Sequence, residues 1–225
     1  MGEKKGSNAS SNNQSHCFEP FISPNPITSL NPVQRFPKID KTAFVSQFSS
    51  VIGDVSICNN VYVAPNVSIR AEEGTPFYIG SNSNIQDGVI LHGLFNRILV
   101  GTNGYSIYIG NEVTIAHGAM VHGPCYIADK VFVSFNSIVY TATVGRGSFI
   151  SYNAVVTNGV RIPPGRFVPP GAHIDSQEKA DVLSTVPKDS KGFVHEVQRV
   201  NHEFPASYHL LFGGNRCSCG FAYVQ

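Results

Sequence analysis

Residues 109–143 read IGNEVT-IAHGAM-VHGPCY-IADKVF-VSFNSI-VYTAT when the chain is written in groups of six. Each group opens with Ile or Val, and its fifth place usually holds a small or β-branched residue. After one five-residue group the period resumes over residues 144–173, and residues 57–68 and 79–92 fit the same template. A period of six, rather than two or three, therefore organises this chain.

Six residues can form one short strand and one corner, so three groups make a triangular coil of about eighteen residues. The opening aliphatic side chain of each group should point inward and stack on its counterpart one coil away, about 4.8 Å above or below. Gly, Asn and Asp tolerate the left-handed backbone that tight corners need. An antiparallel sandwich would instead show hairpin signals every 8–12 residues. The sequence therefore predicts a mainly β fold, a parallel β-helix of hexapeptide repeats over residues 36–175.

Both ends of the chain depart from this pattern. Residues 1–35 are rich in Ser, Asn and Pro and lack the apolar core of a signal peptide, so we expect a disordered or irregular segment. After Ile174 the hexads stop, and residues 176–225 should form a helical segment and a loose tail. Pro205 should kink this helix or divide it. Apolar residues recur there at helical spacing, which predicts a helix on the flank of the coil: Phe193, Val197, Val200, Phe204 and Leu211.

The composition excludes several classes of partner. The net charge is +1 and only 14% of residues are charged, so we expect no nucleic acid partner and no anionic membrane surface. No run approaches the roughly 18 apolar residues that span a bilayer. The five scattered cysteines argue against a secreted disulfide framework, which favours a cytoplasmic protein. Cys58 and Cys125 occupy core places of their hexads, whereas a disulfide between Cys217 and Cys219 would be strained.

Two segments interrupt the hexads, RAEEGTPFY at residues 70–78 and GLFNRILVGTNGYSIY at residues 93–108. Loops that leave a solenoid usually cluster on one face and tend to carry function. We therefore expect both loops at one side of the coil, close to the functional residues.

Three histidines occupy informative hexad places. His92 and His122 are each the second residue of a hexad, so they should project equivalently from neighbouring coils. His117 is the third residue of the preceding hexad and should lie round the corner, on another side of the triangle. The three histidines of one chain therefore cannot readily bind the same metal ion. Packing of three chains about a threefold axis could bring His117 of one chain to His92 and His122 of another.

The strings SIRAEEGTPFYIG, NIQDGVILHG and IAHGAMVHGP resemble those of γ-class carbonic anhydrases, over about residues 36–212. Within that family, EEGTPFYIG and HGL most resemble the N-terminal domain of CcmM-type carboxysome assembly proteins. The resemblance implies a left-handed β-helix with an outer helix and a homotrimer. It also implies Zn²⁺, with iron or cobalt as alternatives, bound by His92 and His122 of one chain and His117 of its neighbour. Three imidazoles leave a fourth position for water, whose pKa falls to about 7, and CO2 is then converted to bicarbonate.

The resemblance assigns further residues one by one. Gln86 matches a residue that hydrogen-bonds the reacting oxygen, and Glu73 matches the carboxylate that handles its proton. Asn84 and Asn201 match pocket residues, and Arg70 with Asp87 matches an ion pair between subunits. Each residue also has a simpler interpretation: Asn and Asp favour corners, while Arg70 and Gln86 could face solvent.

One position departs from the family pattern. Phe95 stands where the archaeal enzyme has an acidic proton shuttle, and Asp and Glu are absent from residues 93–108. Turnover could therefore be slow and the activity weak, unless a residue such as His202 or Glu203 replaces the shuttle. The resemblance separately implies redox-dependent activity, because CcmM-type domains have a C-terminal cysteine pair linked to activity, although Cys217 and Cys219 have a different spacing. Two alternatives to an active carbonic anhydrase stay open. One is a trimeric carboxysome scaffold that keeps the metal site and contacts other carboxysome proteins and Rubisco. The other is a hexapeptide-repeat acyltransferase that uses a single essential histidine.

Overall fold

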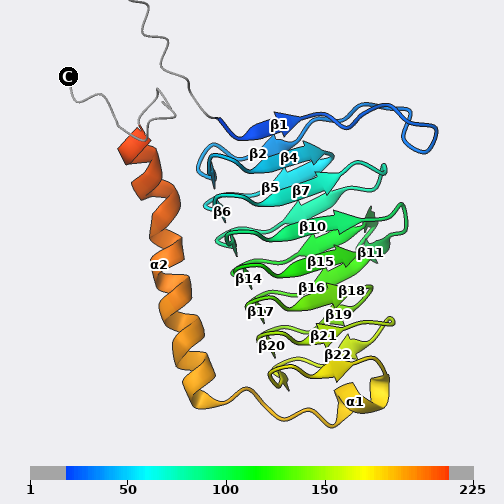
Figure 1. Cartoon of the computed structure of the whole chain (residues 1–225), viewed down its shortest axis with the longest axis vertical. Coiled ribbons are helices and arrows are strands. Elements are labelled where there is room, and N and C mark those ends of the chain that lie inside the picture. Colours follow the sequence, from blue (N-terminus) through cyan, green and yellow to red (C-terminus); the bar gives the residue numbers. More distant parts are fainter. Residues whose placement is uncertain (1–18, 213–225) are drawn as a thin grey trace, which may run out of the picture.

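The computed structural model describes residues 19–212, which wind into a left-handed parallel β-helix with a long helix along its side (Figure 1). The strands of successive coils stack into three parallel sheets, A, B and C. Each coil contributes at most one strand to each sheet, as a triangular solenoid requires. The predicted fold class is confirmed.

The strand bounds follow the order in each sheet. Sheet A contains β1 (Phe21–Ser23), β4 (Ser50–Gly53), β7 (Ser68–Ala71), β10 (Ile90–Gly93), β15 (Met120–Gly123), β18 (Ile138–Tyr140), β21 (Val155–Val156) and β24 (His173–Ile174). Sheet B contains β2 (Lys38–Ile39), β5 (Val55–Ile57), β8 (Phe77–Ile79), β13 (Ile107–Ile109), β16 (Cys125–Ile127), β19 (Thr143–Val144) and β22 (Arg161–Ile162). Sheet C contains β3 (Phe44–Val45), β6 (Tyr62–Val63), β9 (Asn84–Ile85), β14 (Thr114–Ile115), β17 (Phe132–Val133), β20 (Phe149–Ile150) and β23 (Phe167–Val168).

The opening residues of the hexads form the core. Ile85, Ile115 and Val133 are fully buried and lie in register on three successive strands of sheet C. The corners hold residues with positive φ, including Asn66 at 59° and Asn136 at 54°. Asn adopts this left-handed conformation at lower cost than most residues, which explains its recurrence at the corners.

The two interruptions leave the coil at the same corner, between sheets A and B. The first connects β7 to β8, and the second connects β10 to β13. The second contains an antiparallel hairpin of β11 (Ile98–Val100) and β12 (Asn103–Tyr105). The expected clustering of the loops on one side is confirmed.

Helix α2 (Lys188–Phe212) follows the short α1 (Gln177–Asp181) and runs back along the coil toward β1 (Figure 1). It packs on sheet C, where the Tyr208 ring stacks on Phe44 and Tyr62 at centroid distances of 5.0 and 5.5 Å. Pro205 lies inside one continuous helix, so the chain does not form two shorter helices. Leu211 was predicted to face the coil, but it is 49% exposed, and Phe212 packs there instead. Neither helix in residues 19–212 could cross a membrane.

The N-terminal segment is more regular than the sequence predicted. β1 lies within the segment predicted to be irregular and pairs in parallel with β4, so sheet A begins before residue 36. Residues 1–18, and Cys217 and Cys219 in the predicted tail, lie outside the described residues. Cys125 is fully buried as predicted, and this burial raises the pKa of its thiol to about 11, whereas Cys58 is partly exposed.

Because the coils stack closely, we expect alanine substitutions at two glycines to change the stability of the fold in opposite directions. A Cβ on Gly80 would lie 2.5 Å from the backbone carbonyl of Gly110 in the next coil, whereas a Cβ on Gly192 in α2 would meet nothing within 4 Å. We expect Gly80→Ala to destabilise the fold by about 1–3 kcal/mol through overpacking. Gly192→Ala, the matched control, should stabilise it by about 0.5–1 kcal/mol. Thermal unfolding checks both changes, and an unchanged melting temperature for Gly80→Ala would contradict the packing described.

Candidate metal centre in two halves

His92 and His122 lie side by side on the outer face of sheet A. They occupy neighbouring strands β10 and β15, directly opposite each other in register. Nδ1 of His92 is 3.3 Å from Nε2 of His122, and both side chains are half-buried. The residue before each, Leu91 or Val121, points into the core, so strand alternation directs both imidazoles outward. The equivalence of the two hexad places is therefore confirmed.

Charged residues surround this pair. Arg70 is the register partner of His92 on β7, and its guanidinium forms an ion pair with Glu72 at 3.7 Å. Burial lowers the pKa of His92, and the positive charges of Arg70 and His122 act in the same direction, while Glu73 and Glu72 oppose them. A lowered pKa favours the neutral imidazole, which is the form that binds metal ions. We call Arg70, Glu73, His92 and His122 the sheet A half-site.

His117 lies at a different place, on the corner between sheets C and A that joins β14 to β15. Its Nδ1 is 3.0 Å from Oδ2 of Asp87, which occupies the corresponding corner one coil away. The ring stacks on Phe135 at a centroid distance of 5.7 Å and is exposed to solvent. When Nδ1–H donates to the carboxylate, the Nε2 lone pair is left available for a metal, an arrangement typical of histidine ligands.

Gln86 lies beside His117 and is held by a chain of hydrogen bonds. Its Nε2 donates to Oδ1 of Asn84 at 3.0 Å, and Nδ2 of Asn84 donates to Oγ1 of Thr114 at 2.9 Å. Nε2 of Gln198 on α2 donates to the same Oγ1 at 2.9 Å. Gln86 is only 6% exposed, so it does not simply face solvent. The network fixes the orientation of the Gln86 amide.

A cavity of about 530 Å³ joins these residues to α2. Gln86, Asp87, His117 and Asn201 line it, together with apolar side chains from sheet C and α2. We call these four residues the corner half-site. Asn84 was expected to line the pocket as well, but it is 1% exposed and lies beneath Gln86, where it supports the amide. Asn201 lines the cavity while its Nδ2 donates to the Val197 carbonyl at 2.9 Å.

The two half-sites do not meet within one chain. In the described part of the chain, no three His, Cys, Asp or Glu side chains are grouped so that they could hold a metal ion. Arg70 and Asp87 likewise do not pair with each other, because Arg70 pairs with Glu72 and Asp87 contacts His117. Imidazole nitrogens are ligands that suit zinc, iron or cobalt, and within one chain two of them, those of His92 and His122, lie together.

The candidate proton-transfer residues occupy other surroundings. Phe95 is 59% exposed in the loop after β10, and its carbonyl accepts a hydrogen bond from Thr75 Oγ1 at 2.5 Å. His202 contacts Asn60 at 3.2 Å and lines a separate cavity on the other side of α2. Glu203 is exposed and does not line the Gln86 cavity. Within one chain, therefore, neither His202 nor Glu203 adjoins the Gln86 cavity.

The sequence analysis did not predict three residues that belong to the site: Thr114, Phe135 and Gln198. Thr114 precedes a hexad opening and looks like an ordinary buried β-branched residue, and Gln198 looks like a polar helix residue. Only the packing of α2 on sheet C brings the two together.

The repeated coil and outer helix define a hexapeptide-repeat protein. A putative acetyltransferase from Bacillus cereus has the same fold, with a TM-score of 0.67 at 21% identity, covering 85% of this chain and 98% of that one. No family model matches the chain.

Sequence similarity to curated relatives shows to which family of hexapeptide-repeat proteins the chain belongs. The chain is 40% identical to a carbonic anhydrase of Methanosarcina thermophila, over 75% of this chain and 72% of that protein. It is 44% identical to the carboxysome assembly protein CcmM of Nostoc sp., and 46% identical to that of Synechococcus elongatus. These two matches cover 80% and 72% of this chain but only 32% and 30% of the relatives. The chain belongs to the γ-class carbonic anhydrase family, and it spans about a third of the CcmM proteins that it matches.

Proposed function

We propose that this chain is a zinc-dependent carbonic anhydrase of the carboxysomal γ type, which interconverts CO2 and bicarbonate as a homotrimer. The observation that carries the proposal is the division of the site. Each chain presents two adjacent imidazoles on sheet A and a third imidazole on a corner, oriented by Asp87. Three chains about a threefold axis would join the sheet A half-site of one to the corner half-site of the next.

The residues of the two half-sites have distinct tasks in this proposal. His92 and His122 of one chain, with His117 of its neighbour, would hold Zn²⁺, with iron or cobalt as alternative metals. The bound metal would supply a Lewis acid that makes water a nucleophile at neutral pH. Gln86, fixed by Asn84, would orient the reacting oxygen through its amide. Glu73 would accept the proton released as CO2 and water form bicarbonate.

The pairing of Arg70 with Asp87 is proposed between chains. Arg70 contacts Glu72 only at 3.7 Å and remains 43% exposed, and the Asp87 side chain is 51% exposed. Both charges are therefore accessible to a neighbouring chain, and their pairing would hold the two half-sites in register.

Three measurements on the purified protein test this function. Light scattering should give three times the 24.3 kDa mass of the chain, and metal analysis should give one zinc per chain. CO2 hydration should then be measured under oxidising and reducing conditions. A monomer with stoichiometric zinc would contradict the shared site, and a zinc-loaded trimer without hydration under either condition would contradict the enzymatic proposal.

A scaffold is the second candidate, and the CcmM relatives favour it. In this alternative the trimer keeps its metal site for assembly, hydrates CO2 weakly or not at all, and binds other carboxysome proteins and Rubisco. Either function would place the protein in carboxysomes in the cytoplasm. The acyltransferase alternative has only the shared fold in its support.

The absence of an acidic residue from the loop after β10 leads to a prediction about rate. If Phe95 leaves proton transfer slow, kcat should rise with the concentration of a small imidazole buffer. Phe95→Glu should raise kcat at low buffer by up to about 10²-fold, the lower end of what one positioned proton-transfer group contributes. The ratio kcat/KM, which reports attack on CO2, should hardly change. Phe95→Gln is the control for size and polarity, and a fast wild type that is insensitive to buffer would contradict the prediction.

A further inference from the structure

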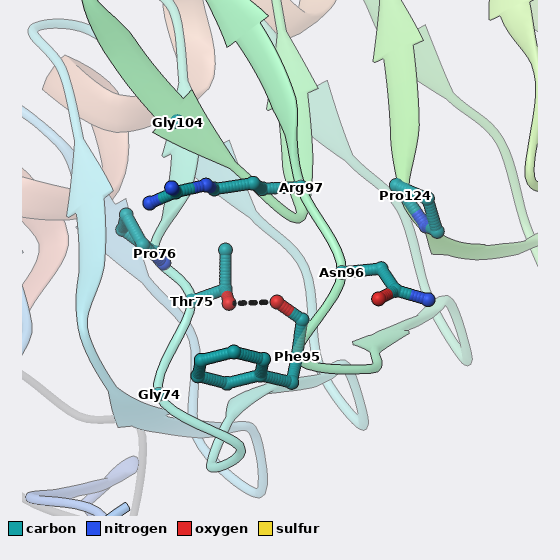
Figure 2. A pocket seen from close by; sticks show the side chains of 8 residues that line it. All are labelled: Gly74, Thr75, Pro76, Phe95, Asn96, Arg97, Gly104 and Pro124. Carbon is teal, nitrogen blue, oxygen red and sulfur yellow. Dashed lines mark hydrogen bonds between the residues drawn. The ribbon is translucent and has the colours of Figure 1, made fainter.

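A second cavity lies at the corner between sheets A and B, where both loops leave the coil (Figure 2). Its volume is about 580 Å³. Three segments build its walls: residues 74–76 from the first loop, residues 95–97 and Gly104 from the second, and Pro124 after β15. Each segment closely follows a residue of the sheet A half-site, namely Glu73, His92 or His122. The cavity therefore adjoins the proposed catalytic centre.

Hydrogen bonds brace the loops that form this cavity. Thr75 Oγ1 donates to the Phe95 carbonyl at 2.5 Å, which ties the first loop to the second. Ser106 Oγ donates to the Leu94 carbonyl at 3.0 Å, which closes the base of the second loop. Asn31 Nδ2 donates to the Glu72 carbonyl at 2.8 Å, which ties the first loop to the N-terminal segment between β1 and β2. The cavity is thus preformed by contacts between segments distant in sequence.

Arg97 supplies the charge of the cavity. Its side chain extends along the wall toward Pro76 (Figure 2) and lies over the hairpin at Gly104, where a Cβ would come within 2.5 Å of Arg97 Cδ. The described residues that line the cavity include no acidic side chain. The ion pairs found within residues 19–212 do not include Arg97, and the nearby Glu72 is paired with Arg70. A guanidinium in this position offers several N–H donors to an anion.

The chemistry of such a cavity suits a small planar oxyanion. Guanidinium groups bind carboxylate-like oxygens through two parallel hydrogen bonds. Phe95 adds an apolar wall, while Asn96 and Pro124 line the side of the cavity opposite the Arg97 guanidinium (Figure 2). The volume is far larger than one small anion, so ordered water would fill the remainder.

We propose that this loop cavity binds bicarbonate, with Arg97 as the residue that recognises the anion. The proposal rests on the proposed function, because bicarbonate is the anion which that reaction forms and consumes. Arg97 would hold bicarbonate next to the sheet A half-site as it enters or leaves. Arg97 is a binding residue in this account, since it lies in the loop rather than among the histidines.

The test follows the Arg97 side chain directly. Arginine Nε–Hε signals of the full chain are recorded by NMR, and the Arg97 signal is identified by its loss in Arg97→Lys. Bicarbonate is then titrated at constant ionic strength against chloride, with phosphate in a parallel titration. We expect a saturable shift of the Arg97 signal with bicarbonate, and none with chloride.

One test variant and two control variants sharpen the result. Gly104→Ala keeps the charge of Arg97 but displaces its stem, and should weaken bicarbonate binding by about tenfold, as expected for a charge-assisted hydrogen bond. Arg161→Gln removes an exposed positive charge on β22, in a different part of the coil, and should leave the Arg97 titration unchanged. His122→Ala should lose zinc under the proposed function but keep the Arg97 shift. This separates failure of the metal site from failure of the anion site.

Three results would overturn the proposal: an Arg97 signal that does not shift, one that shifts equally with chloride, or one that saturates with phosphate but not with bicarbonate. A bicarbonate titration identical in wild type and Gly104→Ala would contradict the placement of Arg97 over the hairpin. A saturable bicarbonate shift in a wild-type protein that binds no zinc would leave the anion site standing and refute the proposed function.

Discussion

Alanine at His92, His117 or His122 will remove bound zinc and CO2 hydration together while leaving the coil folded. All three side chains project outward, and the residues that fill the core beside them, Leu91 and Val121, are unchanged. Loss of an outer-shell partner alone typically costs 10–100-fold in metal affinity. Loss of a ligand should exceed that, so we expect zinc affinity to fall by more than about 100-fold.

Metal analysis after dialysis, CO2 hydration and thermal unfolding should be measured on each variant. His173→Ala is the matched control, because His173 is an exposed histidine at the far end of sheet A. It should keep wild-type zinc and activity. Equal zinc content in the wild type and all three variants would refute the assignment of the ligands.

The hexad pattern predicts the core because each opening residue repeats the same environment. Ile85, Ile115 and Val133 open three hexads and are all fully buried in register. The same logic places His92 beside His122, since second places on neighbouring coils are equivalent. A strict period thus carries three-dimensional information that is rarely present in a single sequence.

Contacts outside the repeat could not be predicted in this way. The support of Gln86 runs through Asn84 and Thr114 to Gln198 on α2, a residue 84 positions from Thr114. The sequence contains no period that relates the helix to sheet C. The contact between Phe95 and Thr75 could not be predicted either, because it depends on two loops of unrelated sequence that meet at one corner.

The continuity of the outer helix could not be predicted from local propensity. Pro205 removes a backbone donor and disfavours helix continuation, yet α2 continues through it to Phe212. Pro205 is buried, and the aromatic rings that follow it stack on Phe44 and Tyr62. Tertiary packing of this kind offsets the local cost. β1 extends sheet A before the first hexad for a related reason, because β4 presents a parallel edge to which it bonds.

Two disabled chains will regain activity when they assemble together, if the centre forms between chains. His117→Ala disables the corner half-site, and His122→Ala disables the sheet A half-site. In a mixed trimer, an interface is intact when the His122→Ala chain supplies His117 and the His117→Ala chain supplies His92 and His122. Random assembly of equal amounts gives this arrangement at about one quarter of interfaces in a cyclic trimer.

The decisive measurement is zinc content and CO2 hydration of these two variants co-expressed in equal amounts. We predict recovery to about one quarter of the wild-type value, against almost none for either variant alone. Co-expression of His92→Ala with His122→Ala is the matched control, because both variants disable the same half-site and no interface is restored. Recovery in the first pair and none in the second would establish a centre shared between chains. No recovery in the first pair, despite mixed trimers confirmed by mass spectrometry, would contradict it.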